Sequence, residues 1–135
     1  MMNFFIRALF VLFWFGGFSQ VHSNLNAYFP EAEFDNIHVK KITSDSLQSC
    51  FIIWIKKGVK GHFHQEHSEN IVVIEGSALM TLDNKELEIN AGDFINIPKG
   101  TKHSVLEVLS EVPLKVLSIQ SPYFDGTDRV FLPEE

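Results

Sequence analysis

The sequence predicts an all-β domain, built as a sandwich or a barrel of short strands. A series of short segments rich in β-branched and aromatic residues follows residue 23, with turn signals roughly every eight to ten residues. No segment after residue 23 shows the 3.6-residue apolar period of an amphipathic helix. The length of 135 residues fits a single domain with a real core.

The first 23 residues have the pattern of a secretory signal peptide. Arg7 is the only charge before the apolar run at residues 8–18, and the chain then turns polar up to Ser23. This run is shorter than the roughly 18 apolar residues that a spanning helix needs, so a retained membrane anchor is the less favoured alternative. We expect cleavage after Ser23, export to a periplasm or the medium, and no membrane attachment afterwards.

The remaining chain divides into an arm, a barrel and a tail. Residues 24–36 carry Pro30 and scattered acids and predict an extended arm. Residues 37–120 contain the strand segments: 37–42, 47–56, a strand carrying His62 and His64, 71–75, 78–82, 86–89, 94–97, 104–109 and 114–119. Gly76 permits a tight bend, residues 57–61, 90–93 and 98–100 predict turns, and residues 83–85 close a hairpin. Residues 121–135 are irregular but apolar enough to pack back on the barrel.

The charge balance excludes some classes of function. The chain has 11 basic and 17 acidic residues, a net charge of −6, and loss of residues 1–23 would remove one arginine and no acid. Phosphate-directed binding of nucleic acid needs clustered Lys and Arg, which the sequence lacks, so no nucleic-acid partner is expected. The single cysteine, Cys50, cannot form an internal disulfide.

Three histidines and one glutamate recur at fixed offsets and suggest a metal site. His62 and His64 lie two residues apart, so a strand would project both to one face. Glu69 lies near the start of the next strand, and His103 follows the turn at residues 98–100. Imidazole suits Fe, Cu, Ni and Zn, and a carboxylate favours harder ions such as Mn or Fe. Four such ligands would leave two positions open on a six-coordinate ion.

These segments resemble the cupin superfamily, whose two motifs are His-x-His-x(3 or 4)-Glu-x6-Gly and Gly-x5-Pro-x-Gly-x2-His-x3-Asn. The chain matches them from His62 to Gly76 and from Gly92 to His103. The chain departs from the family pattern at two positions. The family has a glycine six positions before the first histidine, where this chain has Lys56, and the asparagine that closes the second motif is replaced by Glu107. The resemblance implies a single double-stranded β-helix, or jelly-roll barrel. It also implies that one divalent transition metal (Fe, Mn, Ni, Zn or Cu) is bound by His62, His64, Glu69 and His103.

Two more residues are candidates for moving protons in such a site. Glu107 is expected to share a strand face with His103. His67 is expected at the pocket rim or exposed, with a role as substitute ligand or proton shuttle as the alternative. The pocket walls are expected on the inward strand faces, with Phe51, Ile53, Ile71, Val73 and Phe94.

Two functions remain open at this point. The first is a metal-dependent enzyme of the dioxygenase, isomerase or lyase type, acting on a small oxygen-rich molecule such as a sugar, keto acid or hydroxy acid. The second is a non-catalytic module that binds a carbohydrate or organic acid as its small-molecule ligand. The family resemblance also implies a homodimer paired through barrel edge strands.

Overall fold

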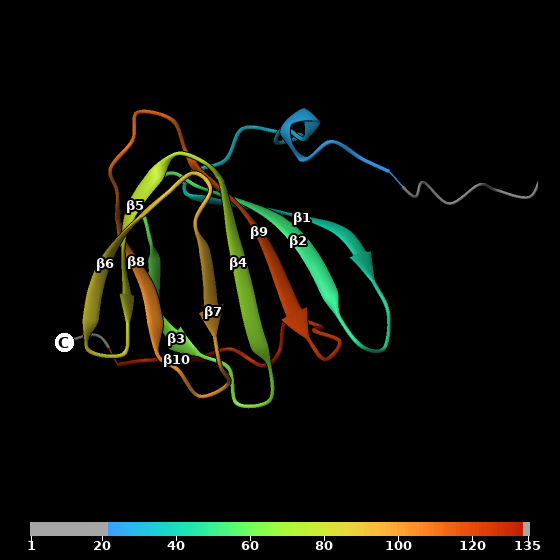
Figure 1. Cartoon of the computed structure of the whole chain (residues 1–135), viewed down its shortest axis with the longest axis vertical. Coiled ribbons are helices and arrows are strands. Elements are labelled where there is room, and N and C mark those ends of the chain that lie inside the picture. The colour runs from blue at the N-terminus through green and yellow to red at the C-terminus, as the bar shows by residue number, and fades with distance from the viewer. Residues whose placement is uncertain (1–21, 134–135) are drawn as a thin grey trace, which may run out of the picture.

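The computed structural model describes residues 22–133, which form a barrel of two five-stranded sheets packed face to face (Figure 1). The strand order is β1-β2-β9-β4-β7 in one sheet and β10-β3-β8-β5-β6 in the other. All paired strands are antiparallel. The predicted all-β jelly-roll fold is therefore confirmed. The predicted signal peptide, residues 1–23, lies almost wholly outside the described residues.

The elements follow one another with short connections. They are η1 (Leu25–Ala27), β1 (Ile37–Ser44), β2 (Ser49–Ile55), β3 (Val59–Phe63), β4 (Ser68–Glu75), β5 (Ser77–Leu82), β6 (Lys85–Asn90), β7 (Phe94–Ile97), β8 (His103–Val108), β9 (Leu114–Ser121) and β10 (Val130–Phe131). No helix among residues 22–133 is long and apolar enough to cross a membrane.

Alternating side chains from both sheets fill the barrel. The buried cluster contains Ile55, Val73, Ala78, Met80, Ile89, Ile95, Ile97, Val105, Leu114 and Val116. On β7, for example, Ile95 and Ile97 are buried whereas Phe94 is exposed, as the two-residue period of a strand requires. Burial of these apolar side chains is the main force that holds the two sheets together.

Two turns show why their residue types are needed. Gly76, between β4 and β5, has φ = 82°, and a Cβ there would lie only 2.8 Å from the Ser110 hydroxyl. Asp83, in the two-residue turn between β5 and β6, also has a positive φ of 49°. The short polar side chain of Asp83 tolerates this conformation, so β5 and β6 close as a tight hairpin. The turn at Gly76 instead carries the chain from β4 in one sheet to β5 in the other.

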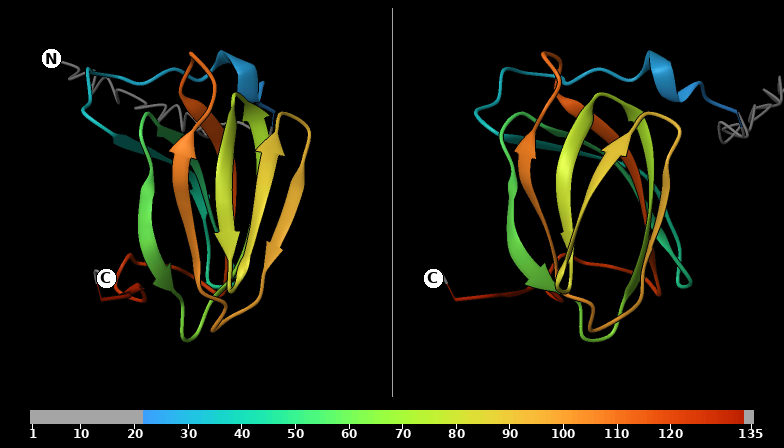
Figure 2. Two further views of the ribbon diagram at one scale, coloured as in Figure 1. Left: turned by 90° about the vertical axis from the view of Figure 1, so that its left-hand side faces the viewer. Right: turned by 60° about the vertical axis from the view of Figure 1, so that its left-hand side comes forward.

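The arm and the tail lie at opposite ends of the barrel (Figure 2). The arm is held by Lys115, whose Nζ donates to the carbonyl oxygens of Leu25 and Tyr28 at 2.8 Å each. The tail runs from residue 122 across the end at which β3 finishes and β8 begins. Its strand β10 pairs with β3, matching Val130 with Phe63 and Phe131 with His62.

Three segments differ from the sequence expectation. Residues 59–61 belong to strand β3, not to a turn, because β3 pairs with β8 from Val59 onward. The tail is not wholly irregular, since its residues 130–131 form β10 against the free edge of β3. The arm includes a short 3₁₀ turn, η1, capped by the side chain of Asn24.

Candidate metal centre

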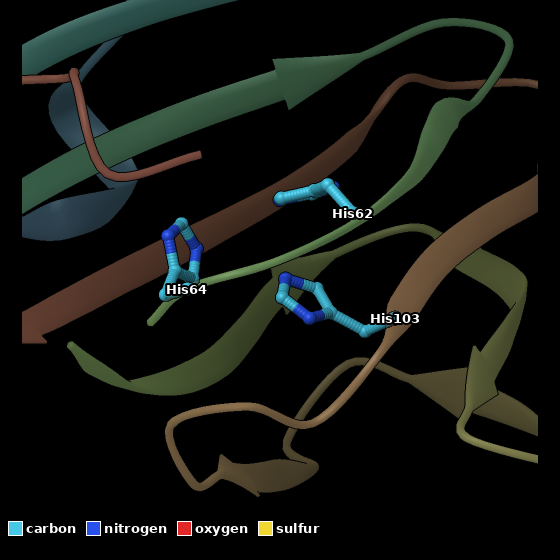
Figure 3. Close-up of side chains that lie close together, drawn as sticks. All are labelled: His62, His64 and His103. Carbon is cyan, nitrogen blue, oxygen red and sulfur yellow. The ribbon is translucent and has the colours of Figure 1, made fainter. Parts of the chain in front are cut away.

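His62, His64 and His103 converge inside the barrel (Figure 3). His62 belongs to β3, His64 follows its end by one residue, and His103 is the first residue of β8. His62 and His103 are direct cross-strand partners. All three side chains are buried, and one ring nitrogen from each lies within 4.8 Å of the others. The antiparallel pairing of β3 and β8 therefore builds the cluster.

The second ring nitrogen of each histidine contacts a backbone carbonyl. The pairs are His62 Nδ1 with Lys60 O at 2.9 Å, His103 Nδ1 with Thr101 O at 3.0 Å, and His64 Nδ1 with Asp128 O. A carbonyl only accepts, so each Nδ1 must carry the proton and donate it. Each Nε2 then has a free lone pair, which is the form of imidazole that binds a metal.

Two of these Nε2 atoms are buried without a partner. Those of His64 and His103 have no hydrogen-bond partner among the residues described. A buried polar atom without a partner is costly and calls for an explanation. A metal ion between the three rings would supply that partner, so the cluster fits one.

Glu69 provides a fourth ligand atom at the same place. It is the second residue of β4 and is buried. Its Oε2 lies 3.6 Å from His64 Nε2 and 3.4 Å from His103 Nε2. Metal bonds of about 2.0–2.2 Å place neighbouring ligand atoms roughly 3.0–3.5 Å apart. These two spacings are close to those of neighbouring ligands on one ion, although the group of ligand atoms that all lie within 4.8 Å of one another contains the three histidines and not Glu69.

The charges of the site follow from burial and from this carboxylate. Burial, together with the neighbouring His103, lowers the pKa of His62 to about 4, so this ring is neutral at neutral pH. Burial also lowers the pKa of His64, but the Glu69 carboxylate and the Asp128 carbonyl outweigh it and leave the pKa raised. Burial raises the pKa of Glu69, yet His103, His64 and Ser118 outweigh it, so the carboxyl stays ionised.

Strand β9 holds Glu69 in place. Ser118 Oγ donates to Glu69 Oε1, and Gln120 Nε2 donates to the same oxygen at 3.3 Å. Both side chains are buried. With Oε1 occupied, Oε2 is directed toward the histidines. Sequence reasoning missed this pair, although two polar residues on the same strand face as the apolar Leu114 and Val116 were a usable signal.

The C-terminal tail fixes the loop that carries His64. The Asp128 carboxylate accepts from the backbone N–H groups of Gln65, Glu66 and His67, at 2.9, 2.9 and 3.1 Å. The Asp128 carbonyl accepts from His64 Nδ1. The ring of Phe124, buried in the same tail, packs edge-on against His64 with centroids 5.4 Å apart. None of these tail residues was a sequence candidate.

His67 is buried, which corrects the expectation of a rim or exposed position. Its Nδ1 contacts the Asp128 carboxylate and its Nε2 lies 2.8 Å from the carbonyl of Tyr123. Both ring nitrogens therefore already contact protein acceptors. His67 has no nitrogen left for a metal or a substrate, and it ties the tail to the loop after β3.

Glu107 does not share the face of His103, because β8 carries a bulge. Met80 pairs with Val105, but the adjacent Leu79 pairs with Glu107, so β8 has an extra residue at this point. Val108 keeps its contact with the core, and Glu107 is exposed. The expectation that Glu107 lies in the pocket is wrong.

A cavity of about 110 Å³ adjoins the histidines. Of the five expected wall residues, Ile53 and Ile71 line it. Phe51 packs against the tail residue Phe124, and Val73 belongs to the filled core. Phe94 is 63% exposed, because the alternation of β7 turns it outward. The expected wall was therefore correct for Ile53 and Ile71 and wrong for the other three residues.

Comparison with known proteins agrees with this architecture. The family model for the cupin domain matches residues 52–120. An uncharacterized protein of Aquifex aeolicus is 32% identical over 100 residues, which are 74% of this chain and 81% of that protein. Quercetin 2,3-dioxygenase of Bacillus subtilis is 32% identical over 75 residues, which are 52% of this chain but 22% of the dioxygenase.

A solved structure shows the same fold at low sequence identity. A Klebsiella pneumoniae protein with a double-stranded β-helix domain has a TM-score of 0.69 and 16% identity, covering 86% of this chain and 99% of its own. The family match stops at residue 120, so the tail that contacts His64 lies beyond it. Because the match spans half of the chain and the barrel has the corresponding fold, this protein belongs to the cupin family.

Proposed function

We propose that the protein is a metal-dependent cupin enzyme that acts on a small oxygen-containing molecule. One observation carries the proposal: three buried histidines each donate Nδ1–H to a backbone carbonyl and turn a free Nε2 toward the same point. Such outer hydrogen bonds fix the tautomer and orientation of metal-binding histidines. The ligands we propose are His62, His64, His103 and Glu69.

A bound ion would supply a Lewis acid or a redox centre for a substrate oxygen. The chain's own contribution is positioning and exclusion of water. Glu69 brings one negative charge to the three histidine rings, and Ser118 and Gln120 hold that carboxylate still. The apolar walls next to the ligands limit the entry of water.

The likeness to quercetin 2,3-dioxygenase supports an enzyme of the dioxygenase type, with isomerase and lyase types as alternatives. The two proteins share a segment of 75 residues, which is only part of each chain. The substrate of that enzyme therefore cannot be assigned to this protein.

A binding module without turnover is the second candidate, and one observation favours it. Neither of the two proton-transfer candidates faces the cavity: Glu107 is exposed, and both nitrogens of His67 contact acceptors of the protein. A general acid or base has to reach its substrate. In this function the metal and the pocket would hold an organic acid or carbohydrate unchanged.

The deciding experiment joins metal content to turnover. The mature domain is purified without added metal, its ion is identified by elemental analysis, and it is incubated with keto acids, hydroxy acids and sugars while oxygen uptake and products are followed. Stoichiometric metal with product formation supports the enzyme. Metal with the ligand recovered unchanged supports the module, and absence of metal overturns both.

We also propose that the chain is exported, with a mature start near Asn24. The support is the signal-like pattern of residues 1–23, in which Arg7 precedes an apolar run. Mass spectrometry of the N-terminus of the protein, recovered from cell fractions, tests this. A mature N-terminus near residue 24 outside the cytoplasm supports export, and an intact Met1 in the cytoplasm contradicts it.

A homodimer is proposed as well, on the analogy with barrels that pair through edge strands. The edge strand β1 exposes Val39 at 51% and Ile37 at 44%. Light scattering of the purified domain measures the mass directly. Twice the monomer mass is expected, and a monomer at all accessible concentrations would refute the pairing.

A further inference from the structure

Apart from the proposed metal ligands, most residues that line the cavity next to the histidines are apolar. Its apolar lining comes from strands of both sheets: Ile53, Ile55, Val59, Ile71, Met80 and Val116. Ile37 and Val39 of the edge strand β1 also line the cavity and are partly exposed to solvent. A sugar would lose hydration of many hydroxyl groups against such walls without regaining hydrogen bonds. The walls suit a ligand with a hydrocarbon body.

Most polar lining groups are already engaged. Ser104 Oγ lies 2.6 Å from Thr81 Oγ1. Gln120 uses its Nε2 on Glu69, and its buried Oε1 has no partner among the residues described. Gln120 Oε1 can therefore accept one hydrogen bond from a ligand, in a pocket with few other free polar groups.

Arg129 is the one cation that lines the cavity in the described part of the chain. It lies between Asp128, which holds the His64 loop, and Val130, which pairs with Phe63 in β3. No carboxylate within residues 22–133 forms an ion pair with it, and its guanidinium lies 5.9 Å from the ring of Phe124. The tail thus places an exposed guanidinium, which pairs with no carboxylate of residues 22–133, beside a largely apolar cavity in an acidic protein.

We propose that the pocket selects a small organic acid with a branched apolar body, whose carboxylate is bound by Arg129. This rests on the proposed function and deepens it by naming the ligand class. A guanidinium pairs with a carboxylate through two parallel hydrogen bonds, a geometry that a neutral amide cannot match. The hydrocarbon body lies against Ile37, Val39 and Ile53, and the proposed metal ligands line the same cavity.

Three probes separate the parts of this claim. 4-Methylpentanoate has the charge and the apolar body, 4-methylpentanamide has the body without the charge, and gluconate has the charge with a polar body. Isothermal titration calorimetry of the mature domain, both as purified and after removal of metal by chelation, measures each affinity. The metal-free arm keeps the test independent of the metal, so a failure to bind metal and a failure of acid recognition give different results.

Arg129→Gln should lower the affinity for 4-methylpentanoate about tenfold or more, which is the scale of a charge-assisted hydrogen bond. The affinity for 4-methylpentanamide should not change, and Arg129→Lys should restore part of the lost affinity for the acid. Lys85→Gln, an exposed change on β6 away from the cavity, is the matched control. Val39→Ser should lower the affinity for 4-methylpentanoate and 4-methylpentanamide and leave the affinity for gluconate unchanged.

The expected order of affinity is acid, then amide, then gluconate. The proposal is overturned if gluconate binds as tightly as 4-methylpentanoate, if the amide equals the acid, if Arg129→Gln has no effect, or if the acid does not bind at all.

Discussion

The site is built by two regions that differ in how they relate to the sequence. Strands β3, β4 and β8 bring the four proposed ligands, His62, His64, His103 and Glu69, at spacings that follow local strand and turn geometry. Strand β9 and the tail bring no ligand, yet they hold two of the four in place. Ser118 and Gln120 orient Glu69, and Asp128 orients His64. The proposed ligands and the groups that orient them therefore come from different parts of the chain.

The two regions should respond differently to mutation. Loss of a ligand removes a bond to the metal, whereas loss of an orienting group leaves the bond available but less well directed. Orienting partners typically account for about ten- to a hundredfold in metal affinity. Four experiments follow from this difference, from the largest expected effect to the smallest.

Substitution of a ligand should have the largest effect. His103→Ala removes one of the three converging Nε2 atoms, and we expect zinc affinity to fall at least about a hundredfold, since structural zinc binding of about 10–16 kcal/mol is shared among four ligands. Competition with a chromophoric chelator measures this. His38→Ala is the control, because His38 lies outside the cluster, against Phe34 and Trp54. Equal affinities for the two variants would remove His103 from the site.

Metal affinity should fall as the pH falls, since protons compete with the metal for imidazole. His62, with a pKa of about 4, stays neutral above pH ~5 and contributes little. His64 has a raised pKa. At a pH above that pKa its ring is neutral and metal binding displaces no proton. At a pH below that pKa each bound ion displaces one proton from His64. Affinity should then drop about tenfold per pH unit.

The variant Glu69→Gln tests whether His64 causes this pH dependence. The variant removes the carboxylate that raises the pKa of His64, so the fall in affinity should begin at a lower pH. Calorimetric zinc titrations from about pH 5 to 8, in buffers of different ionisation enthalpy, count the protons released. An affinity that is the same across this range would contradict the assignment of His64.

Loss of the tail carboxylate should have an intermediate effect. Asp128→Ala frees the loop after β3, because three backbone N–H groups and the His67 ring lose their acceptor. We expect zinc affinity to fall about tenfold and the free energy of unfolding to fall by about 1–3 kcal/mol. Urea denaturation of the metal-free protein measures the second quantity separately.

Asp125→Ala is the matched control for this variant. Asp125 is exposed and accepts hydrogen bonds only from Thr127 among the described residues. If both tail variants bind zinc like the parent protein, the Asp128 carboxylate does not contribute to the orientation of His64.

The smallest effect is expected at Glu107. It lies on β8 with His103 but is exposed beyond the bulge, so Glu107→Gln should change metal affinity and ligand turnover less than about twofold. A large loss of turnover in this variant, with metal content unchanged, would show that the exposed carboxylate reaches the substrate after all.

The fold and the ligand positions were predictable because they depend on local rules. A two-residue strand period places His62 and His64 together, and the turn before His103 starts β8 at that residue. The same rule failed at Glu107, where one extra residue in β8 changed the face. It failed at Phe94 because the sequence did not show which face of β7 was buried.

The orienting contacts were not predictable because they join distant residues. Asp128 and His64 are separated by 64 positions, and the Ser118 and Glu69 side chains by 49. No local period relates such pairs, and the tail lies beyond the segment that the family model describes. Only the polar inward positions of β9 gave a hint, since a buried polar side chain needs a partner.

The most direct test of the metal centre is anomalous X-ray diffraction from crystals of the metal-loaded domain, measured on both sides of the absorption edge of its ion. We expect one strong peak within about 2.0–2.2 Å of the Nε2 atoms of His62, His64 and His103 and of a Glu69 oxygen. A peak at the Nδ1 atoms or elsewhere on the protein, or no peak between the rings in a domain that carries metal, would contradict the account.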